Sequence, residues 1–135
     1  MVILIDTNIF LEYLLAQEKA EECFGAIKTI IDADIEAVIS SFSLHSIEVI
    51  MLRNKLNDKL REFLGVISGI QCITVYNTTP EEDIEALDLM KKTMLDFDDA
   101  IQFYIAKKLK GVLLTLDRHF DKITEVKVIK PWEII

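Results

Sequence analysis

Carboxylate side chains follow two apolar segments of the sequence at the point where each segment ends. Asp6 comes directly after "VILI" at residues 2–5, and Asp117 comes directly after "VLLTL" at residues 112–116. Short aliphatic runs of this kind predict strands that are buried on both faces of a parallel sheet. In open parallel sheets, ligands bind at the carboxyl ends of the strands. The sequence therefore predicts that Asp6 and Asp117 lie at one ligand-binding edge.

Other acids are expected at the same edge. Glu48 falls one or two turns into a helix that follows a predicted strand at residues 36–40, and "LDFDDA" places Asp96, Asp98 and Asp99 at the start of a later helix. Each acid alone has a plainer interpretation, because Asp residues often cap helices and Glu is common on a solvated helix surface. Taken together, the plain interpretations require several coincidences at one edge, so the set favours a functional site.

Such a cluster needs a source of positive charge. Two carboxylates ~5 Å apart at an effective dielectric of ~20 repel each other by roughly 3 kcal/mol, so four can stay ionised only beside bound cations. A set of oxygen ligands without Cys suits Mg²⁺ or Mn²⁺ better than Zn²⁺. His45 and His119 are scattered and lack a third ligand pattern, so they are interpreted as ordinary histidines. We therefore expect a site for Mg²⁺ or Mn²⁺.

The elements that position these acids alternate between strands and helices. Thr79-Pro80-Glu81-Glu82 is a capping-box start for one helix, and Gly111 is expected to stop another. Alternation of this kind predicts an α/β fold with a central, mainly parallel sheet of about four or five strands between two helical layers. The expected strands are residues 2–5, 36–40, 72–76, 112–116 and 126–129, and the expected helices begin near residues 9, 20, 44, 60, 80 and 97.

Length and composition suit one domain over residues 1–135, with 51% hydrophobic residues to form its core. The apolar start carries no Lys or Arg and ends at Asp6, which is unlike a signal peptide, and no apolar run is long enough for a membrane span. Cys23 and Cys72 lie far apart without CxxC spacing, which predicts reduced thiols. We expect a cytoplasmic protein that does not enter membranes.

The net charge of −8, from 23 acids and 15 bases, is unusual for a protein that binds nucleic acid. Four clustered acids account for half of this charge, and two divalent cations would neutralise them. Three groups of basic residues are available to contact phosphates, or equally to form solvated helix surfaces. These groups lie at residues 53–61, 91–92 and 107–110.

Four segments, in order along the chain, resemble the motifs of the PIN-domain nucleases, a family that includes the toxin ribonucleases of VapBC-type toxin–antitoxin pairs. The segments are "LIDTNIF", "SLHSIEVI", "DFDDAIQFYIAKK" and "VLLTLDRHF". The resemblance implies a PIN-like three-layer α/β/α sandwich and a divalent-metal-dependent endoribonuclease that hydrolyses RNA phosphodiester bonds. It also implies a homodimer, and for a toxin a small antitoxin partner whose tail covers the acidic pocket.

The resemblance implies that Asp6, Glu48, Asp99 and Asp117 form a catalytic and metal-binding quartet. Asp96 is the alternative to Asp99 as its third member, and Asp98 is interpreted as a surface cap. Asn8 and Thr115 are expected to orient ligands or contact phosphate. A supporting small polar position stays open among Ser40, Ser41 and Ser43.

Other functions remain to be weighed against this one. A non-catalytic PIN-like interaction scaffold is one alternative, and a PIN nuclease for RNA processing or other structured nucleic acid is another. A haloacid-dehalogenase-type phosphatase needs a second acid two residues after the first, where this chain has Asn8. A response-regulator receiver needs an acidic pair after its first strand, whereas Asp6 stands alone there.

Overall fold

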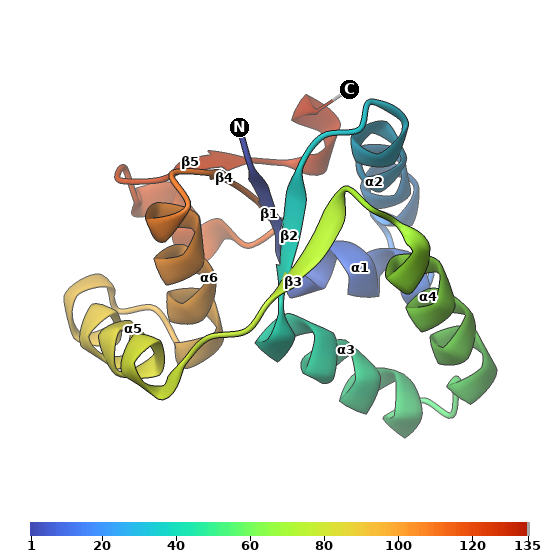
Figure 1. Ribbon diagram of the computed structural model, residues 1–135, viewed down its shortest axis with the longest axis horizontal. Helices are drawn as coiled ribbons and strands as arrows, with labels where there is room; N and C mark the ends of the chain where they lie inside the picture. The colour runs from blue at the N-terminus through green and yellow to red at the C-terminus, as the bar shows by residue number, and fades with distance from the viewer. Residues whose placement is uncertain (135) are drawn as a thin grey trace.

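A computed structural model describes residues 1–134, and in this part of the chain five short strands form one parallel sheet. The strand order across the sheet is β3-β2-β1-β4-β5, so the first strand lies at the centre (Figure 1). The prediction of a parallel sheet of four or five strands is therefore confirmed. The strands are β1 (Ile3–Ile5), β2 (Ala37–Ser40), β3 (Ile73–Tyr76), β4 (Val112–Leu114) and β5 (Lys127–Ile129).

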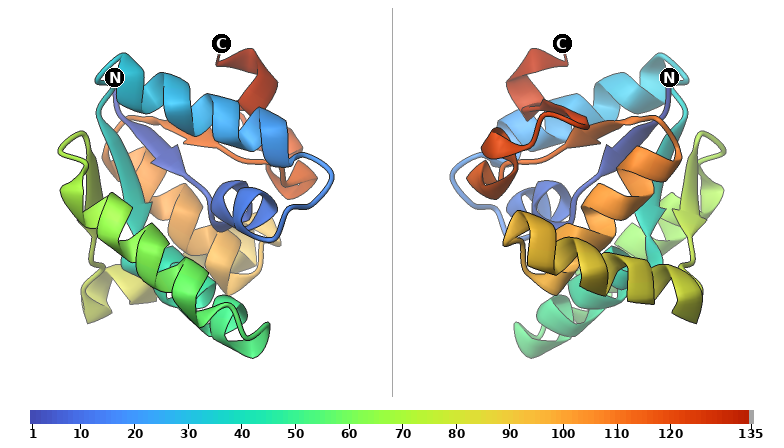
Figure 2. Two further views of the ribbon diagram at one scale, coloured as in Figure 1. Left: turned by 90° about the vertical axis from the view of Figure 1, so that its right-hand side faces the viewer. Right: turned by 90° about the vertical axis from the view of Figure 1, so that its left-hand side faces the viewer.

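Helices cover both faces of the sheet, which confirms the three-layer α/β/α arrangement (Figure 1). Figure 2 shows α1, α2 and α4 toward the viewer from one side and α5 and α6 from the other. Helix α3 continues from the carboxyl end of β2. The helices are α1 (Thr7–Leu14), α2 (Ala20–Asp32), α3 (Ser41–Arg53), α4 (Asn57–Gly69), α5 (Pro80–Thr93) and α6 (Phe97–Lys108), with the 3₁₀ turns η1 (Arg118–Lys122) and η2 (Pro131–Glu133).

The central strands are buried on both faces because neighbouring side chains point to opposite layers. Ile3 and Ile5 pack in the cluster formed with α1, α2 and α4, whereas Leu4 packs in the cluster formed with α6. The same alternation occurs in β4, where Leu113 belongs to the α6 side and Leu114 to the other. The aliphatic run of β1 is thus explained by burial on two sides.

The parallel register determines which residues meet at the carboxyl edge of the sheet. Ile5 of β1 pairs with Leu114 of β4, so the next residues, Asp6 and Thr115, follow side by side. The backbone N–H of Asp6 donates to the carbonyl oxygen of Leu114 at 2.9 Å. Ser40 ends β2, the strand on the other side of β1. Residues from distant parts of the chain therefore gather at this edge.

A buried carboxylate joins β3, α5 and α6. The predicted capping box is confirmed, since Thr79 Oγ1 accepts from Glu82 N and Glu82 Oε1 accepts from Thr79 N. Glu82 Oε2 accepts from Tyr76 at 2.5 Å, Tyr104 at 3.0 Å and Lys108 at 2.7 Å. The hydrogen bond from Lys108, followed by that from Tyr76, lowers the pKa of Glu82 to about 2. The network holds α6 against its neighbours.

Two further expectations concern the cysteines and the membrane. Cys23 and Cys72 are both free thiols, as predicted. Among the described residues, no helix has the length and apolar character that crossing a bilayer requires.

Gly111 was expected to stop α6, and the helix does end at Lys108, shortly before it. Lys110, and not Gly111, takes the positive φ of 52° there. Gly111 is required for a close approach, because a Cβ atom on it would lie 2.6 Å from the carbonyl oxygen of Val2. The close approach brings the start of β4 beside β1, where Val112 N donates to the same Val2 oxygen at 2.8 Å.

Gly111→Ala should destabilise the protein by about 1–3 kcal/mol, because the β1–β4 pair must shift to accept the new methyl group. Gly65→Ala is the matched control: a Cβ there meets nothing within 4 Å. In the interior of α4 it should stabilise by about 0.5–1 kcal/mol. Urea denaturation measures both changes. A neutral Gly111→Ala would show that the close approach does not constrain the sheet.

Candidate active site

Asp6 is buried at the edge of the sheet and caps the helix that follows it. It is 2% exposed, and Oδ1 accepts from the backbone N–H of Thr7 at 2.7 Å, so Asp6 is the N-cap of α1. Oδ2 accepts from Thr115 Oγ1 at 2.7 Å and from Asn8 Nδ2 at 3.2 Å. The two predicted supporting residues therefore both contact Asp6 and restrict the orientation of its carboxylate.

Asp117 is joined to Asp6 through Thr115. Thr115 Oγ1 accepts from the backbone N–H of Asp117 at 2.9 Å while it donates to Asp6. Asn8 Oδ1 accepts from the backbone N–H of Leu116 at 3.2 Å, which ties α1 to the same loop. Asp117 in turn caps η1, since its Oδ1 accepts from His119 N at 2.8 Å. The parallel β1–β4 pair thus aligns two acids that are 111 residues apart.

The start of α6 brings a third acid to this edge. Asp96 is exposed and is the N-cap of α6, because its Oδ1 accepts from the backbone N–H of Asp99 at 2.8 Å. Asp99 is 4% exposed, and its Oδ2 lies 3.2 Å from His119 Nδ1. The interpretation of Asp98 as the cap was wrong. Of the two alternatives for the third ligand, the structure places Asp99 beside Asp117 and uses Asp96 to begin the helix.

Three side chains at this edge are close enough to share a metal ion. Asp99, Asp117 and His119 each offer one ligand atom, and these atoms lie within 4.8 Å of one another. Carboxylate oxygens are the donors that Mg²⁺ and Mn²⁺ prefer, and an imidazole nitrogen is compatible with Mn²⁺. The residues at the edge therefore fit the divalent cation that the sequence predicted.

Asp98 belongs to a polar network that runs from α6 to α3. Its Oδ1 accepts from Gln102 Nε2 at 3.1 Å, and the same nitrogen donates to Ser43 Oγ at 2.5 Å. Ser40 caps α3 by accepting from Ser43 N at 2.9 Å, and Thr7 Oγ1 donates to Ser43 Oγ at 2.7 Å. Ser40 and Ser43 are completely buried in this network. Of the three serines left open by the sequence, the structure places Ser40 and Ser43 in this network, whereas Ser41 is half-buried.

Gln102 forms the centre of that network. It is completely buried, and among the residues that the structure describes its Oε1 is the buried side-chain polar atom without a hydrogen-bond partner. A glutamine within the otherwise apolar middle of α6, "AIQFYIA" at residues 100–106, is the signal by which the network could have been found in the sequence.

Glu48 has a different environment from the other three members of the predicted quartet. Its Oε1 lies 2.9 Å from Nδ1 of His45 on the same helix, and its side chain is 29% exposed. A helix turns about 100° per residue, so Glu48 is about 140° around α3 from Ser43, which faces the polar network. The structure therefore brings Asp6, Asp99 and Asp117 together, and it pairs Glu48 with His45. The role of Glu48 as a ligand stays a prediction.

Burial and mutual repulsion make these acids reluctant to ionise. Burial raises the pKa of Asp6 to about 7, with the charges of Asp98 and Asp117 acting in the same direction. Burial raises the pKa of Asp99 to about 7, opposed by the hydrogen bond with His119 and reinforced by the charges of Asp117, Asp96 and Asp6. Burial also raises the pKa of Asp98. A divalent cation would reverse these shifts by favouring the ionised forms.

Two groups at the edge were not assigned to the site from sequence, Asp98 and His119. The charge of Asp98 helps to raise the pKa of Asp6, after the larger effect of burial. His119 lies at the end of an Asp-x-His spacing directly after a strand, which was the available signal. A lone Asp-x-His spacing is weak evidence without the position of Asp99.

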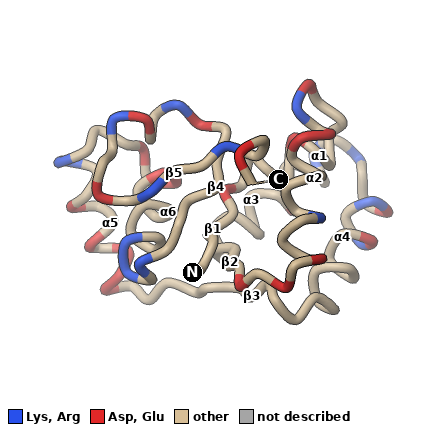
Figure 3. Tube along the Cα trace, turned by 90° about the horizontal axis from the view of Figure 1, so that it is seen from above, with Lys and Arg blue, Asp and Glu red and all other residues tan. Residues whose placement is uncertain are grey.

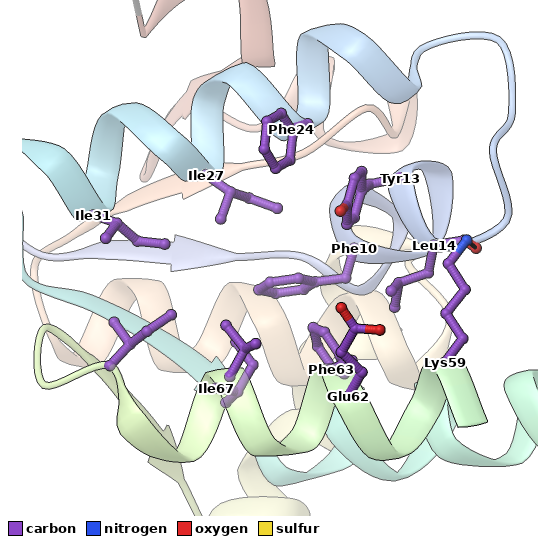
Figure 4. A pocket seen from close by; sticks show the side chains of 12 residues that line it. Phe10, Tyr13, Leu14, Phe24, Ile27, Ile31, Lys59, Glu62, Phe63 and Ile67 are labelled. Carbon is purple, nitrogen blue, oxygen red and sulfur yellow. Dashed lines mark hydrogen bonds between the residues drawn. The ribbon is translucent and has the colours of Figure 1, made fainter. Parts of the chain in front are cut away.

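A separate apolar groove lies between α1, α2 and α4, away from these acids (Figure 4). Figure 4 shows Phe10, Phe63 and Ile67 lining it, with Phe24 and Tyr13 stacked beside it. Its cavity volume is about 170 Å³. The groove contains no cluster of carboxylates and is distinct from the acidic edge.

Comparison with known families gives a match over most of the chain. The family model described as "PIN domain" matches residues 3–126. A search of the curated proteins found no significant match.

Solved structures share the fold at low sequence identity. A toxin–antitoxin complex from Klebsiella pneumoniae is 21% identical, covers 96% of this chain and 97% of its own, and has a TM-score of 0.69. VapC20 from Mycobacterium tuberculosis, described as a Sarcin-Ricin loop cleaving toxin, is 14% identical, with 93% and 98% coverage and a TM-score of 0.71. VapBC2 from Rickettsia felis, bound to a promoter DNA fragment, is 14% identical, with 96% and 98% coverage and a TM-score of 0.71.

The raised pKa of Asp99 predicts how pH changes stability in metal-free buffer. Between its ordinary pKa of about 4 and its folded value of about 7, the folded state binds more protons than the unfolded state. Asp99 therefore contributes stability at low pH that is lost as the pH rises through 7.

Asp99→Asn keeps the neutral form at every pH, so its free energy of unfolding relative to wild type should increase from pH 4 to pH 8. Urea denaturation at several pH values measures the difference. Adding Mg²⁺ or Mn²⁺ should increase the free energy of unfolding of the wild type at pH 8 and leave that of the variant nearly unchanged. A difference that stays flat or narrows over this range would contradict a raised pKa for the buried carboxylate of Asp99.

Proposed function

Because the chain belongs to the PIN domain family, we propose that it is a divalent-metal-dependent endoribonuclease that hydrolyses phosphodiester bonds in RNA. The observation that carries the proposal is the meeting of Asp6, Asp99 and Asp117 at the carboxyl edge of the parallel sheet. The family and its nuclease class follow from the family match. The metal and the RNA substrate belong to the proposal, which treats residues 1–135 as one PIN-like domain.

The proposed cation is Mg²⁺ or Mn²⁺, held by Asp99 and Asp117 with Asp6 beside them. When bound, such an ion lowers the pKa of a water molecule and stabilises negative charge on phosphate oxygens. The protein's part is to hold the carboxylates in place. Thr115 and Asn8 bond Asp6 directly, and hydrogen bonds from the backbone N–H groups of Asp117 and His119 orient Asp117 and its loop.

The fourth carboxylate of the proposed site has two candidates. The electrostatics favour Asp98, because its charge helps to raise the pKa of Asp6 and the charge of Asp117 helps to raise the pKa of Asp98. The motif resemblance favours Glu48, whose partner in the structure is His45. Gln102 holds the Asp98 carboxylate from the helix interior, so Asp98 is oriented whether or not an ion is bound.

The distribution of charge limits how RNA is contacted. Figure 3 shows basic residues interleaved with acids over several elements, without one continuous basic stripe. Lys107 pairs with Glu125 and Lys108 with Glu82, so part of the third basic group is already neutralised. We propose that the cation supplies much of the attraction for phosphate, while the basic residues of α3 and α4 near 53–61 contact the backbone.

In the proposed biological role, the protein acts in the cytoplasm as the toxin of a toxin–antitoxin pair. Neighbouring structures include complexes of this kind, so a small antitoxin and a second copy of this chain are the proposed protein partners. The apolar groove between α1, α2 and α4 leaves Phe24 and Val66 exposed and offers surface for a protein contact. A housekeeping RNA-processing enzyme and a non-catalytic scaffold are the alternatives.

Asp6→Asn and Asp117→Asn should each reduce the rate of RNA cleavage in Mg²⁺ or Mn²⁺ by about 100-fold or more, because each removes a charge that helps to hold the ion. Cleavage of a mixed RNA pool measures the loss. Asp32→Asn is the control with the same chemical change, at an exposed position on α2 paired with Lys28. Equal cleavage by wild type and both site variants would reject the proposed site, and no cleavage by any protein would favour the scaffold.

Asp98→Asn and Glu48→Gln separate the two candidates for the fourth carboxylate. We expect Asp98→Asn to weaken Mn²⁺ binding by about 10-fold or more, and Glu48→Gln to change it little, because Asp98 lies among the site charges. Isothermal titration with Mn²⁺ gives both dissociation constants. A larger loss of Mn²⁺ affinity with Glu48→Gln would identify Glu48 as the fourth carboxylate of the site.

A further inference from the structure

The nitrogen atom of His119 lies between two carboxylates of the proposed metal site. Nδ1 is 3.0 Å from Asp117 Oδ1 and 3.2 Å from Asp99 Oδ2. These three side chains form the group whose ligand atoms lie within 4.8 Å of one another. We propose that His119 is a ligand of the cation through Nδ1, so that the site is a mixed nitrogen and oxygen centre that takes Mn²⁺ or Co²⁺ in preference to Mg²⁺. This inference rests on the metal site of the proposed function.

The distances agree with adjacent positions around one ion. In an octahedral site with bonds of about 2.1 Å, neighbouring ligand atoms are about 3.0 Å apart, and in a tetrahedral site they are about 3.4 Å apart. The separation of 3.0 Å from Asp117 matches the octahedral value, and the separation of 3.2 Å from Asp99 lies between the two values. A hydrogen bond has a similar length, so the distances alone allow both, and the surroundings of His119 decide between them.

The backbone around His119 is held firmly while its ring is free to exchange partners. His119 N donates to Asp117 Oδ1 at 2.8 Å, and the next residue, Phe120, is completely buried. The ring itself is 70% exposed, whereas the side chain of Asp99 is 6% exposed. The imidazole can therefore give up a hydrogen bond for a metal bond at little cost in desolvation. Asp99 is the buried anchor of the group.

The ligand chemistry points to a class of ion. Imidazole nitrogen binds Mn²⁺, Co²⁺, Ni²⁺ and Zn²⁺, while Mg²⁺ is bound mainly by oxygen. Carboxylates from Asp99 and Asp117 with one histidine are a common donor type for the first group of ions. The imidazole nitrogen of His119, as a third donor, should raise the affinity for Mn²⁺ and Co²⁺ more than that for Mg²⁺.

The chain contains its own control histidine. His45 Nδ1 lies 2.9 Å from Glu48 Oε1 on α3, and its side chain is 72% exposed, much like that of His119. His45 therefore resembles His119 in exposure and in having a carboxylate beside Nδ1. It differs in having one such carboxylate, where His119 has two from different elements.

The test measures ion binding by the complete chain without RNA. Pulsed electron paramagnetic resonance of the Mn²⁺-loaded protein should show coupling to a directly bound nitrogen, absent in His119→Ala and retained in His45→Ala. His119→Ala should weaken Mn²⁺ binding by about 10-fold or more and Mg²⁺ binding by less. Circular dichroism checks that both variants are folded.

Three results would overturn the inference: no nitrogen coupling in the wild type, coupling that persists in His119→Ala, or Mn²⁺ binding in His119→Ala that is as tight as in the wild type or tighter. The last result would mean that the ring competes with the ion for Asp99 and Asp117. RNA cleavage is measured separately. Nitrogen coupling without cleavage would reject the ribonuclease and keep the histidine ligand, and cleavage that needs Asp117 without nitrogen coupling would do the reverse.

Discussion

The repulsion between carboxylates buried at one edge of a parallel sheet is the constraint on which the rest of this structure depends. The pKa values of Asp6 and Asp99 are both raised to about 7, first by burial and then by neighbouring acids. Such groups are costly for the fold when ionised, and they are retained where a cation can bind them. Much of the surrounding polar structure serves to hold these acids in place.

The polar network has two parts, one that contacts Asp6 and one that links α6 to α3. Thr115 after β4 and Asn8 in α1 hold Asp6, and Gln102, Ser40 and Ser43 link α6, which carries Asp98, to α3. Farther away, Glu82 joins β3, α5 and α6 and so fixes the helix that carries Asp99. The acids are therefore positioned by contacts from both sides of the sheet. Positioning of this kind is what the proposed metal-dependent nuclease activity requires of the protein.

The sequence predicted those residues of the site whose positions depend on neighbouring residues, and it missed those whose positions depend on the packing of distant elements. Asp6 and Asp117 come directly after strands, and the parallel register then brings them to one edge, so their proximity could be inferred. Asp99 and Asp96 are three residues apart at a helix start, and Asp96 turned out to be the cap. His119 and Asp98 were left out, because their participation depends on how η1 and α6 sit against β4.

By itself, the sequence determined the order of strands and helices, the capping box of α5, the acids that end β1 and β4, and the family, because these depend on neighbouring residues and on motif spacing. Tertiary structure alone decided which acids face one another. A helix turns about 100° per residue, so its rotation against the sheet, set by packing of distant side chains, decides where each acid lies. That rotation places Asp99 beside Asp117 and His119, whereas the pairing of Glu48 with His45, three residues earlier on α3, is local to the helix.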